Sequence, residues 1–320
     1  MKLIKEKKWA IVFSLLAMLL WGSAIPLIKT TYIHANIIPD DTGGKILIAG
    51  IRFFMAGLLT FIYFGLFNKE EVKKENINIK LTLVLALLQT CLQYMFYYIG
   101  LSNTLGSLAA VIQASNAFIT VVISVILINE EKFTKRKLAA LIVGSIGILI
   151  INLRGGGGFH FKLSGEGFVL IATTFNALAS VLIRKYGRNL NGFLLTGSQF
   201  VLGATPLIIL GAITHKSNVN FDFVLFLMLS YGAFISATAF TIWTFVLQNH
   251  SASEFGIYKL FIPVFGTILS ILVLGEDLTV NIVLGLIFVL LGAIILNKKQ
   301  RDNRKLKRWI QWIHSNLIYY

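Results

Sequence analysis

The chain has 320 residues, of which 56% are hydrophobic and only 13% are charged. A soluble domain carries roughly 25% charged residues, and the mean hydropathy of +0.78 is that of a membrane protein. These values exclude a disordered chain, a secreted disulfide scaffold and an ordinary cytosolic enzyme. The net charge of +15 would suggest nucleic-acid binding in a soluble protein, but in an apolar chain it can report which loops face the cytoplasm.

The single cysteine, Cys91, excludes an intramolecular disulfide and a zinc site built from several cysteines. It lies in an apolar stretch, where we interpret it as a small buried residue. The first apolar run continues past Trp9 for about 20 residues, longer than the hydrophobic region of a cleavable signal peptide. We therefore expect this run to be a membrane span.

Apolar runs long enough to cross a bilayer recur along the chain, with short polar breaks between them. A span needs about 20 apolar residues, and continuous runs of that length indicate helices rather than the alternating strands of a barrel. Ten spans are predicted, at residues 8–30, 45–67, 80–101, 107–128, 135–153, 165–187, 192–214, 222–247, 254–275 and 279–297. The sequence thus predicts an all-α integral membrane protein with ten transmembrane helices.

Basic residues fall mainly on one side of this predicted topology. With the N-terminus inside, most of the 29 Lys and Arg residues lie in inner segments. The outer loops hold Lys45, Arg154, Lys162 and Lys216, whereas Lys29, Arg52 and Lys259 lie inside spans or at their ends. Because positively charged loops face the cytoplasm, we expect both termini there, with the protein in the cell (inner) membrane.

The two halves of the chain share short elements in the same order. Residues 129–134 read Asn-Glu-Glu-Lys-Phe-Thr and residues 275–279 read Gly-Glu-Asp-Leu-Thr, each after a long apolar run. Leu-Ile-Lys at 27–29 corresponds in the same way to Leu-Ile-Arg at 182–184. We interpret the halves as two copies of one five-span unit.

This interpretation divides the chain into four parts. They are a first repeat at 1–153, an outer linker at 154–164, a second repeat at 165–297 and a basic tail at 298–320. Since five is an odd number, the second repeat is inverted in the membrane, which places Glu130 inside and Glu276 outside. Inverted repeats recur in secondary transporters, with the binding site at the repeat interface.

A set of short elements recurs through the predicted spans. They are Trp21-Gly22-Ser23 with Lys29 in span 1, Arg52-Phe53 in span 2, Gly-Leu-Ser at 100–102, the glutamate elements that close spans 4 and 9, Pro263, and the glycine-rich spans 5 and 10. In this combination residues 9–297 resemble an EamA-type permease of the drug/metabolite transporter superfamily. The resemblance implies ten helices, a central cavity and alternating access, but no particular substrate. In one departure from the family pattern, Ala117 stands opposite Pro263, which puts a kink in span 4 in question.

Lys259 is the first candidate for a substrate-binding residue. A charged group inside a span costs about 2.5–3.5 kcal/mol and calls for a partner or a cavity. Its helical face carries small residues: Pro263, Gly266 and Ser270. Two interpretations are open: an ammonium that lines a cavity and binds a carboxylate or phosphate, or a lysine that reaches the inner interface. Gln113, at the equivalent position of the first repeat, and Asn116 could line the same cavity or bond between helices.

Further polar and aromatic side chains within spans are candidates for the same site. They are Trp21, Gln93, Tyr97, Asn176 and Trp243. Tryptophans at mid-span are unlike those of the interfacial belt, so they could stack on a substrate or simply pack. Arg52 could bind substrate or pair with a helix end of the other repeat.

Two prolines and two charged residues are candidates for gating and coupling. Pro26 and Pro263 lie within spans, where proline frees a backbone carbonyl and bends the helix. Lys29 ends span 1 and could close an outer gate or anchor the helix at the interface. Glu254 begins span 9 and could be a proton-linked carboxylate or a charge that complements the helix dipole. Because no acid lies deep in any predicted span, coupling through a buried carboxylate has little support.

Signatures of an enzyme are missing from the sequence. The five histidines lie in predicted loops or the tail, and the glycine run at 155–158 lacks the Gly-Lys-Ser/Thr of a phosphate-binding loop. We therefore predict no cofactor, no metal and no nucleic-acid partner. The tail from residue 298 mixes basic and apolar residues and predicts an amphipathic helix on the inner leaflet, with a disordered basic tail as the alternative.

Together these observations predict a permease rather than an enzyme. It would move a small polar metabolite, such as an amino acid or related organic anion, by alternating access, with the substrate and the lipid bilayer as its partners. The alternatives are a polytopic membrane enzyme that acts on lipid, an exporter of drugs or lipid-linked substrates from the same superfamily, and a channel. A homodimer is one option for the assembly.

Overall fold

The computed structural model describes residues 2–68, 78–129, 134–152 and 161–297. All regular secondary structure within these ranges is helical. After a short turn at Lys2–Lys5, the elements are α1 (Lys7–His34), α2 (Thr42–Phe67), α3 (Ile79–Leu85), η3 (Ala86–Leu92), α4 (Gln93–Ser102), α5 (Gly106–Leu127), α6 (Lys135–Asn152), η4 (Leu163–Gly167), α7 (Phe168–Tyr186), α8 (Gly192–Thr214), α9 (Phe223–Asn249), α10 (Ala252–Phe255), η5 (Gly256–Leu260), α11 (Phe261–Leu274) and α12 (Val280–Asn297). The prediction of an all-helical chain is confirmed for the described residues.

Six helical segments are long and apolar enough to cross a membrane. They are Lys7–His34, Thr42–Phe67, Ile79–Ser102, Leu163–Tyr186, Gly192–Thr214 and Phe223–Asn249. Four shorter apolar stretches, Ser115–Leu127, Leu138–Gly147, Phe261–Leu274 and Val280–Gly292, lie within the remaining long helices. The protein is therefore a multi-pass membrane protein, and each predicted range contains helix.

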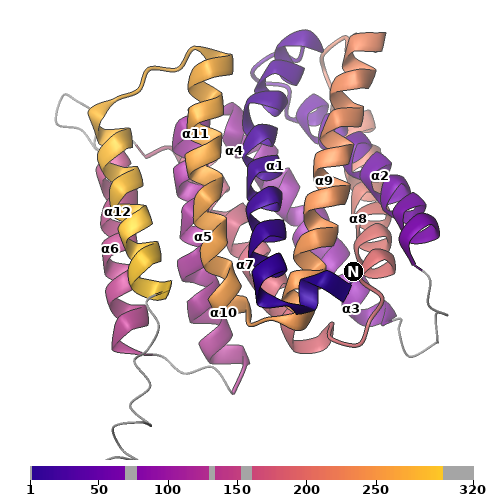
Figure 1. The fold of residues 1–320 in the computed structure, drawn as a ribbon. Coiled ribbons are helices and arrows are strands. Elements are labelled where there is room, and N and C mark those ends of the chain that lie inside the picture. Colours follow the sequence, from indigo (N-terminus) through magenta and orange to yellow (C-terminus); the bar gives the residue numbers. More distant parts are fainter. Residues whose placement is uncertain (1, 69–77, 130–133, 153–160, 298–320) are drawn as a thin grey trace, which may run out of the picture.

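Helices from the two halves of the chain pack against each other throughout the bundle. Figure 1 shows α6 beside α12 at one edge and α2 beside α8 at the other. Between these edges, α1 contacts α9 and α11, while α5 contacts α7 and α11. The crossing of α1 and α11 is close, because a Cβ on Gly22 would lie 2.7 Å from Cβ of Phe265. The centre of the bundle is thus built by both halves.

The buried apolar side chains form two clusters along this interface. One contains Phe53, Tyr98 and Phe240, and the other contains Trp243 and Phe255. Trp21 of α1 is partly buried and packs against both clusters. Trp21 thus connects the two clusters.

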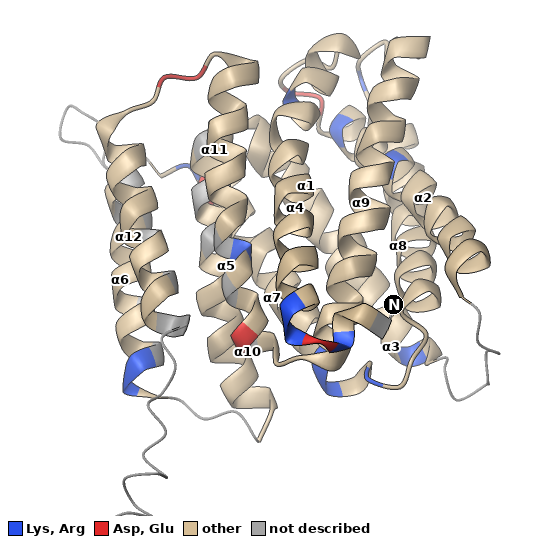
Figure 2. Ribbon diagram, viewed as in Figure 1, with Lys and Arg blue, Asp and Glu red and all other residues tan. Residues whose placement is uncertain are grey.

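Charged residues are divided unequally between the two ends of the bundle. The basic end, as we call it, holds the starts of α1 and α6 and the end of α7, where Lys and Arg gather (Figure 2). The opposite, acidic end holds the α1–α2, α8–α9 and α11–α12 loops, with Asp40, Asp41, Asp222, Glu276 and Asp277. This division agrees with the loop charges expected from the sequence.

Two carboxylates connect neighbouring loops at the acidic end through hydrogen bonds. Asp41 caps α2 by accepting from Gly44 N at 2.8 Å, and its other oxygen accepts from Ser217 N at 2.7 Å. Burial alone would raise the pKa of Asp41, but the hydrogen bonds from Ser217 and Gly44 outweigh it and hold the pKa at about 2. Asp222 caps α9 through Leu225 N, and this bond together with His34 lowers its pKa. The α1–α2 and α8–α9 loops are therefore held together.

Candidate functional site

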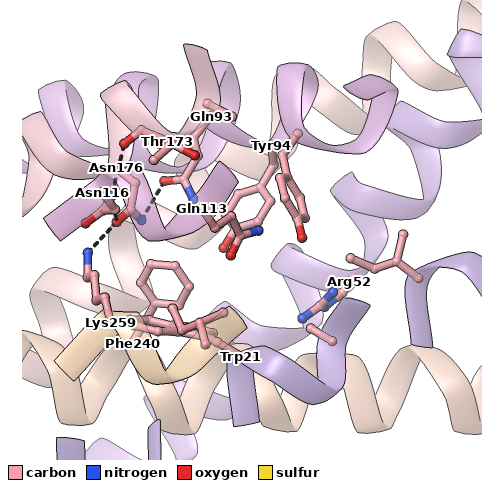
Figure 3. A pocket seen from close by; sticks show the side chains of 15 residues that line it. Trp21, Arg52, Gln93, Tyr94, Gln113, Asn116, Thr173, Asn176, Phe240 and Lys259 are labelled. Carbon is pink, nitrogen blue, oxygen red and sulfur yellow. Dashed lines mark hydrogen bonds between the residues drawn. The ribbon is translucent and has the colours of Figure 1, made fainter. Parts of the chain in front are cut away.

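A cavity lies between the two halves of the bundle. Its lining is mostly aromatic and polar: Trp21, Ala24, Ile28, Arg52, Gln93, Tyr94, Tyr97, Gln113, Asn116, Ala172, Thr173, Asn176, Phe240, Lys259 and Ile262. Figure 3 shows the polar side chains converging from several helices. No Asp or Glu is among these lining residues.

Lys259 reaches the cavity from a break between two helices. The chain forms a short turn of 3-10 helix, η5, before α11 begins at Phe261. Pro263, in the first turn of α11, has no N–H to give to the carbonyl of Lys259. The side chain is only 2% exposed, so the lysine does not reach the interface as one interpretation proposed.

Neutral groups alone surround the ammonium of Lys259 among the described residues. Nζ donates to Oδ1 of Asn176 at 2.5 Å and to Oγ of Ser180 at 3.0 Å. It also lies 4.9 Å from the ring centre of Trp243 and 5.7 Å from that of Trp21. Aromatic faces and side-chain oxygens stabilise a cation, but they leave its charge uncompensated.

A row of amide side chains leads away from this ammonium along the cavity wall. Oδ1 of Asn176 accepts from Lys259 and from Nδ2 of Asn116 at 3.1 Å, while Nδ2 of Asn176 donates to Oε1 of Gln93 at 3.0 Å. Nδ2 of Asn116 also donates to the carbonyl of Thr173. Figure 3 marks these bonds. Asn176 turns its amide oxygen toward the ammonium, and the row links α4, α5 and α7.

Arg52 is the second cation of the cavity and is 4% exposed. Its Nε donates to the carbonyl of Gly232 at 2.9 Å, and Nη1 donates to the hydroxyl of Tyr98 at 3.0 Å. A Cβ on Gly232 would lie 2.9 Å from Cδ and Nε of Arg52, so the close approach to α9 needs glycine there. The guanidinium thus bonds to a mid-helix carbonyl of α9, rather than to a helix end, and also lines the cavity.

The two tryptophans hold different positions relative to the cavity. Trp21 lines it, and its buried Nε1 has no hydrogen-bond partner among the described residues. Trp243 is 1% exposed and lies behind Lys259, where its Nε1 donates to Ser180 at 3.4 Å. All the other predicted substrate-binding residues line the cavity, whereas Trp243 does not. Contact between any of these residues and a substrate stays a prediction.

The gating and coupling candidates lie away from the cavity lining. Lys29 donates to the carbonyl of Thr104 at 2.8 Å and lies 3.8 Å from Oε1 of Glu276. Pro26 lies inside α1 and is buried. Glu254, the coupling candidate, is not among the residues that line the cavity. It belongs to α10 at the basic end, is 46% exposed and pairs with Lys7.

Sequence reasoning missed several cavity residues. Tyr94, Thr173 and Phe240 all line it. Gln89, four residues before Gln93, lies in the π-helical turn η3, where it is fully buried and has no partner among the described residues. A π-turn adds a residue to the helix and leaves no mark in the hydrophobic pattern.

The sequence model of the EamA-like transporter family matches residues 8–153 and 163–298. The chain belongs to this family. An uncharacterized transporter, YvbV of Bacillus subtilis, is 25% identical over 95% of this chain and 96% of its own. A protein of Chlamydia muridarum named as an S-adenosylmethionine/S-adenosylhomocysteine transporter is 23% identical over 90% of this chain and 91% of its own.

Among solved structures, a crystal structure is similar in fold to this EamA-family chain. The TM-score is 0.69 at 16% sequence identity, covering 91% of this chain and 96% of the other. At that identity the likeness concerns the fold alone. Family membership, the relatives named as transporters and the membrane-spanning helices together make this protein a membrane transporter.

Proposed function

We propose that this EamA-family protein is a secondary transporter of a small polar metabolite that carries a carboxylate, such as an amino acid or related organic anion. The observation that carries the proposal is Lys259, a buried ammonium without an acidic partner among the described residues, on the wall of a cavity between the two halves. A carboxylate from the substrate would supply the missing charge. Gln113, Asn116 and the amide row would orient the rest of the molecule.

The proposal includes ten membrane helices in two inverted repeats, at 1–153 and 165–297. Helix packing supports this division, because contacts occur in pairs related by exchange of the halves. α2 packs on its counterpart α8, and α6 packs on its counterpart α12. The contact of α1 with α11 is matched by that of α7 with α5. Glu130, most of the proposed linker at 154–164 and the tail at 298–320 lie outside the described residues.

The orientation we propose puts both termini in the cytoplasm of a cell with this protein in its cytoplasmic membrane. The basic end carries Lys7, Lys8, Lys135 and Arg136, and the N-terminal turn lies there. The acidic end would face outward. Transport would proceed by alternating access, with Lys29 at the outer gate and the prolines Pro26 and Pro263 allowing α1 and α11 to bend.

The relative named for S-adenosylmethionine transport supports the substrate class, since that compound is an amino acid derivative with a carboxylate. A lipid-modifying enzyme has less support. It would need a deep acid, a histidine pair or a metal site, and no group of three His, Cys, Asp or Glu residues among those described could hold a metal. We therefore propose that the protein is not an enzyme.

The test is counterflow in proteoliposomes. Purified protein is first screened for thermal stabilisation by amino acids and organic acids, because a ligand stabilises the state that it binds. Stabilising compounds are then used in radiolabelled exchange with wild type, Lys259→Gln and a control, Lys185→Gln, which removes an exposed cation. We expect Lys259→Gln to lower exchange by about tenfold or more, as for loss of a charged hydrogen bond, at an unchanged melting temperature.

Four results would overturn this proposal. Unchanged exchange in Lys259→Gln would remove Lys259 from the site. Turnover of lipid without solute movement would favour the enzyme, and single-channel currents would favour the channel. Stabilisation only by drugs or lipid-linked compounds would favour the exporter of the same superfamily.

A further inference from the structure

The cavity holds a second buried cation that the proposed function leaves without a role. Arg52 of α2 and Lys259 of η5 both line it, and no acidic residue does. Neither cation has an ion pair with a described residue. Two buried charges of the same sign in one cavity are costly to keep, which indicates that the ligand compensates both.

We propose that the substrate is a divalent organic anion, with one acidic group at Lys259 and a second at Arg52. This inference rests on the proposed function and narrows its substrate class. A monoanion bound at Lys259 would leave Arg52 uncompensated, whereas a dianion neutralises both cations at once. The loaded cavity then carries no net charge across the apolar interior.

Arg52 has hydrogen-bond donors left to bind such a group. A guanidinium has five N–H donors in a planar fork, and two of them go to Gly232 and Tyr98. The remaining donors have no partner among the residues that the structure describes. The two existing bonds fix the plane of the fork, which suits paired bonding to a carboxylate or a phosphate group.

The wall between the cations defines the middle of the substrate. Figure 3 shows Lys259 and Arg52 at opposite sides of the view, with Trp21, Phe240 and Tyr94 between them. Rings of Trp21 and Phe240 meet edge to face at 4.9 Å between centres, which makes this stretch aromatic and apolar. The matching ligand has acidic groups at both ends and an apolar or planar middle.

Binding of matched dicarboxylates to the full chain in detergent tests this assignment. Glutarate is compared with glutaramate, which has the same length but an amide in place of the second acid, by titration calorimetry. The comparison is repeated along the series from malonate to pimelate, because the best length reports the separation of the cations. We expect the wild type to bind the diacid of best length about tenfold or more tighter than its monoamide.

Variants assign the two acidic groups to the two cations. Arg52→Gln should bring the ratio of diacid to monoamide affinity to about one while the monoamide still binds, because the charged hydrogen bond is gone. Arg52→Lys should keep part of the preference, since it keeps the charge without the fork. Lys259→Gln should weaken both ligands, and Lys185→Gln should weaken neither.

The outcomes separate this inference from the function on which it rests. A wild-type ratio of about one at every length, with the monoamide bound, would overturn the second subsite and leave the carboxylate transporter standing. An equal loss of affinity for the diacid and the monoamide in Arg52→Gln would show that Arg52 is only a structural link between α2 and α9. Failure of every mono- and dicarboxylate to bind the wild type would overturn both. The wild-type comparison needs no variant, so it decides the matter even if Arg52→Gln does not fold.

Discussion

Nζ of Lys259 lies 2.5 Å from Oδ1 of Asn176, and the same oxygen accepts from Asn116 of α5. Lys259 and Asn176 belong to the second half of the chain, whereas Asn116 belongs to the first. The anchor of the buried ammonium is therefore shared across the interface between the halves. Any sliding of α5 against α7 therefore changes the hydrogen bonds around the ammonium of Lys259. Because we propose that this ammonium binds the substrate, the binding site is coupled to the conformation of the bundle.

A double-mutant cycle measures this anchor. Asn176→Leu removes an acceptor from a buried cation and should cost about 1–3 kcal/mol of stability. Lys259→Met removes the cation and should cost little or stabilise the protein, since an apolar side chain fits a buried site better than an unpaired charge. In the double variant most of the cost of Asn176→Leu should disappear. Unfolding in denaturant checks this, and purely additive effects would show that the two side chains are not coupled.

The contact between Arg52 and α9 predicts sensitivity at a single glycine. Gly232→Ala places a methyl group 2.9 Å from Cδ and Nε of Arg52, so the guanidinium must move or the helices must separate. We expect a loss of about 1–3 kcal/mol, typical of overpacking. Gly65→Ala in α2 is the control, because a Cβ there meets nothing within 4 Å; it should be neutral or stabilise by up to about 1 kcal/mol. Equal melting temperatures of the two variants would contradict the contact.

The sequence predicts the helices well because each lies in a long apolar run. It also predicts which side chains gather at the cavity, since polar residues spaced by three or four share one helical face. Gln113 and Asn116 are an example, and the structure brings both to the cavity. Their role toward a substrate remains a proposal.

Other features have no counterpart in the hydrophobic pattern. Arg52 is held by the carbonyl of Gly232, and a backbone acceptor cannot be found from residue types. Tyr94 and Phe240 line the cavity, but within an apolar run they look like ordinary packing residues. Glu254 lies in the first turn of the predicted span, but α10 and η5 interrupt that span and leave the turn exposed at the basic end.

The low pKa of Asp41 predicts that the contact between the α1–α2 and α8–α9 loops weakens in acid. Its folded pKa of about 2 is below the ordinary value of 3.8, so the unfolded chain binds more protons between these values. The stabilisation is fully present above about pH 4 and is lost as the pH falls toward 2. Asp41→Asn should remove this part of the decline in melting temperature between pH 5 and pH 2, whereas the exposed neighbour variant Asp40→Asn should keep it. Parallel profiles of both variants would contradict the role of Asp41.

Glu276 joins three elements at the acidic end of the bundle. It lies between α11 and α12, and its Oε1 accepts from Gly106 N at 2.8 Å, at the start of α5. The same oxygen is 3.8 Å from Nζ of Lys29, which donates to the carbonyl of Thr104. The carboxylate therefore caps a helix of one half from a loop of the other. Separation of the halves at this end must break these bonds.

Glu276→Ala should consequently favour opening of the acidic end. Loss of a helix cap and a partly buried ion pair amounts to about 1–2 kcal/mol. This corresponds to a shift of about 5- to 30-fold in the equilibrium between the closed and the open acidic end. Cys91, the single cysteine, is replaced by alanine, and Ala24→Cys then places a thiol on the cavity wall. Labelling of this thiol by a membrane-impermeant maleimide, in vesicles with the acidic end exposed, should accelerate in Glu276→Ala. The adjacent exposed residue supplies the control, Asp277→Ala, and the same rate in both variants would show that the carboxylate of Glu276 does not hold this end closed.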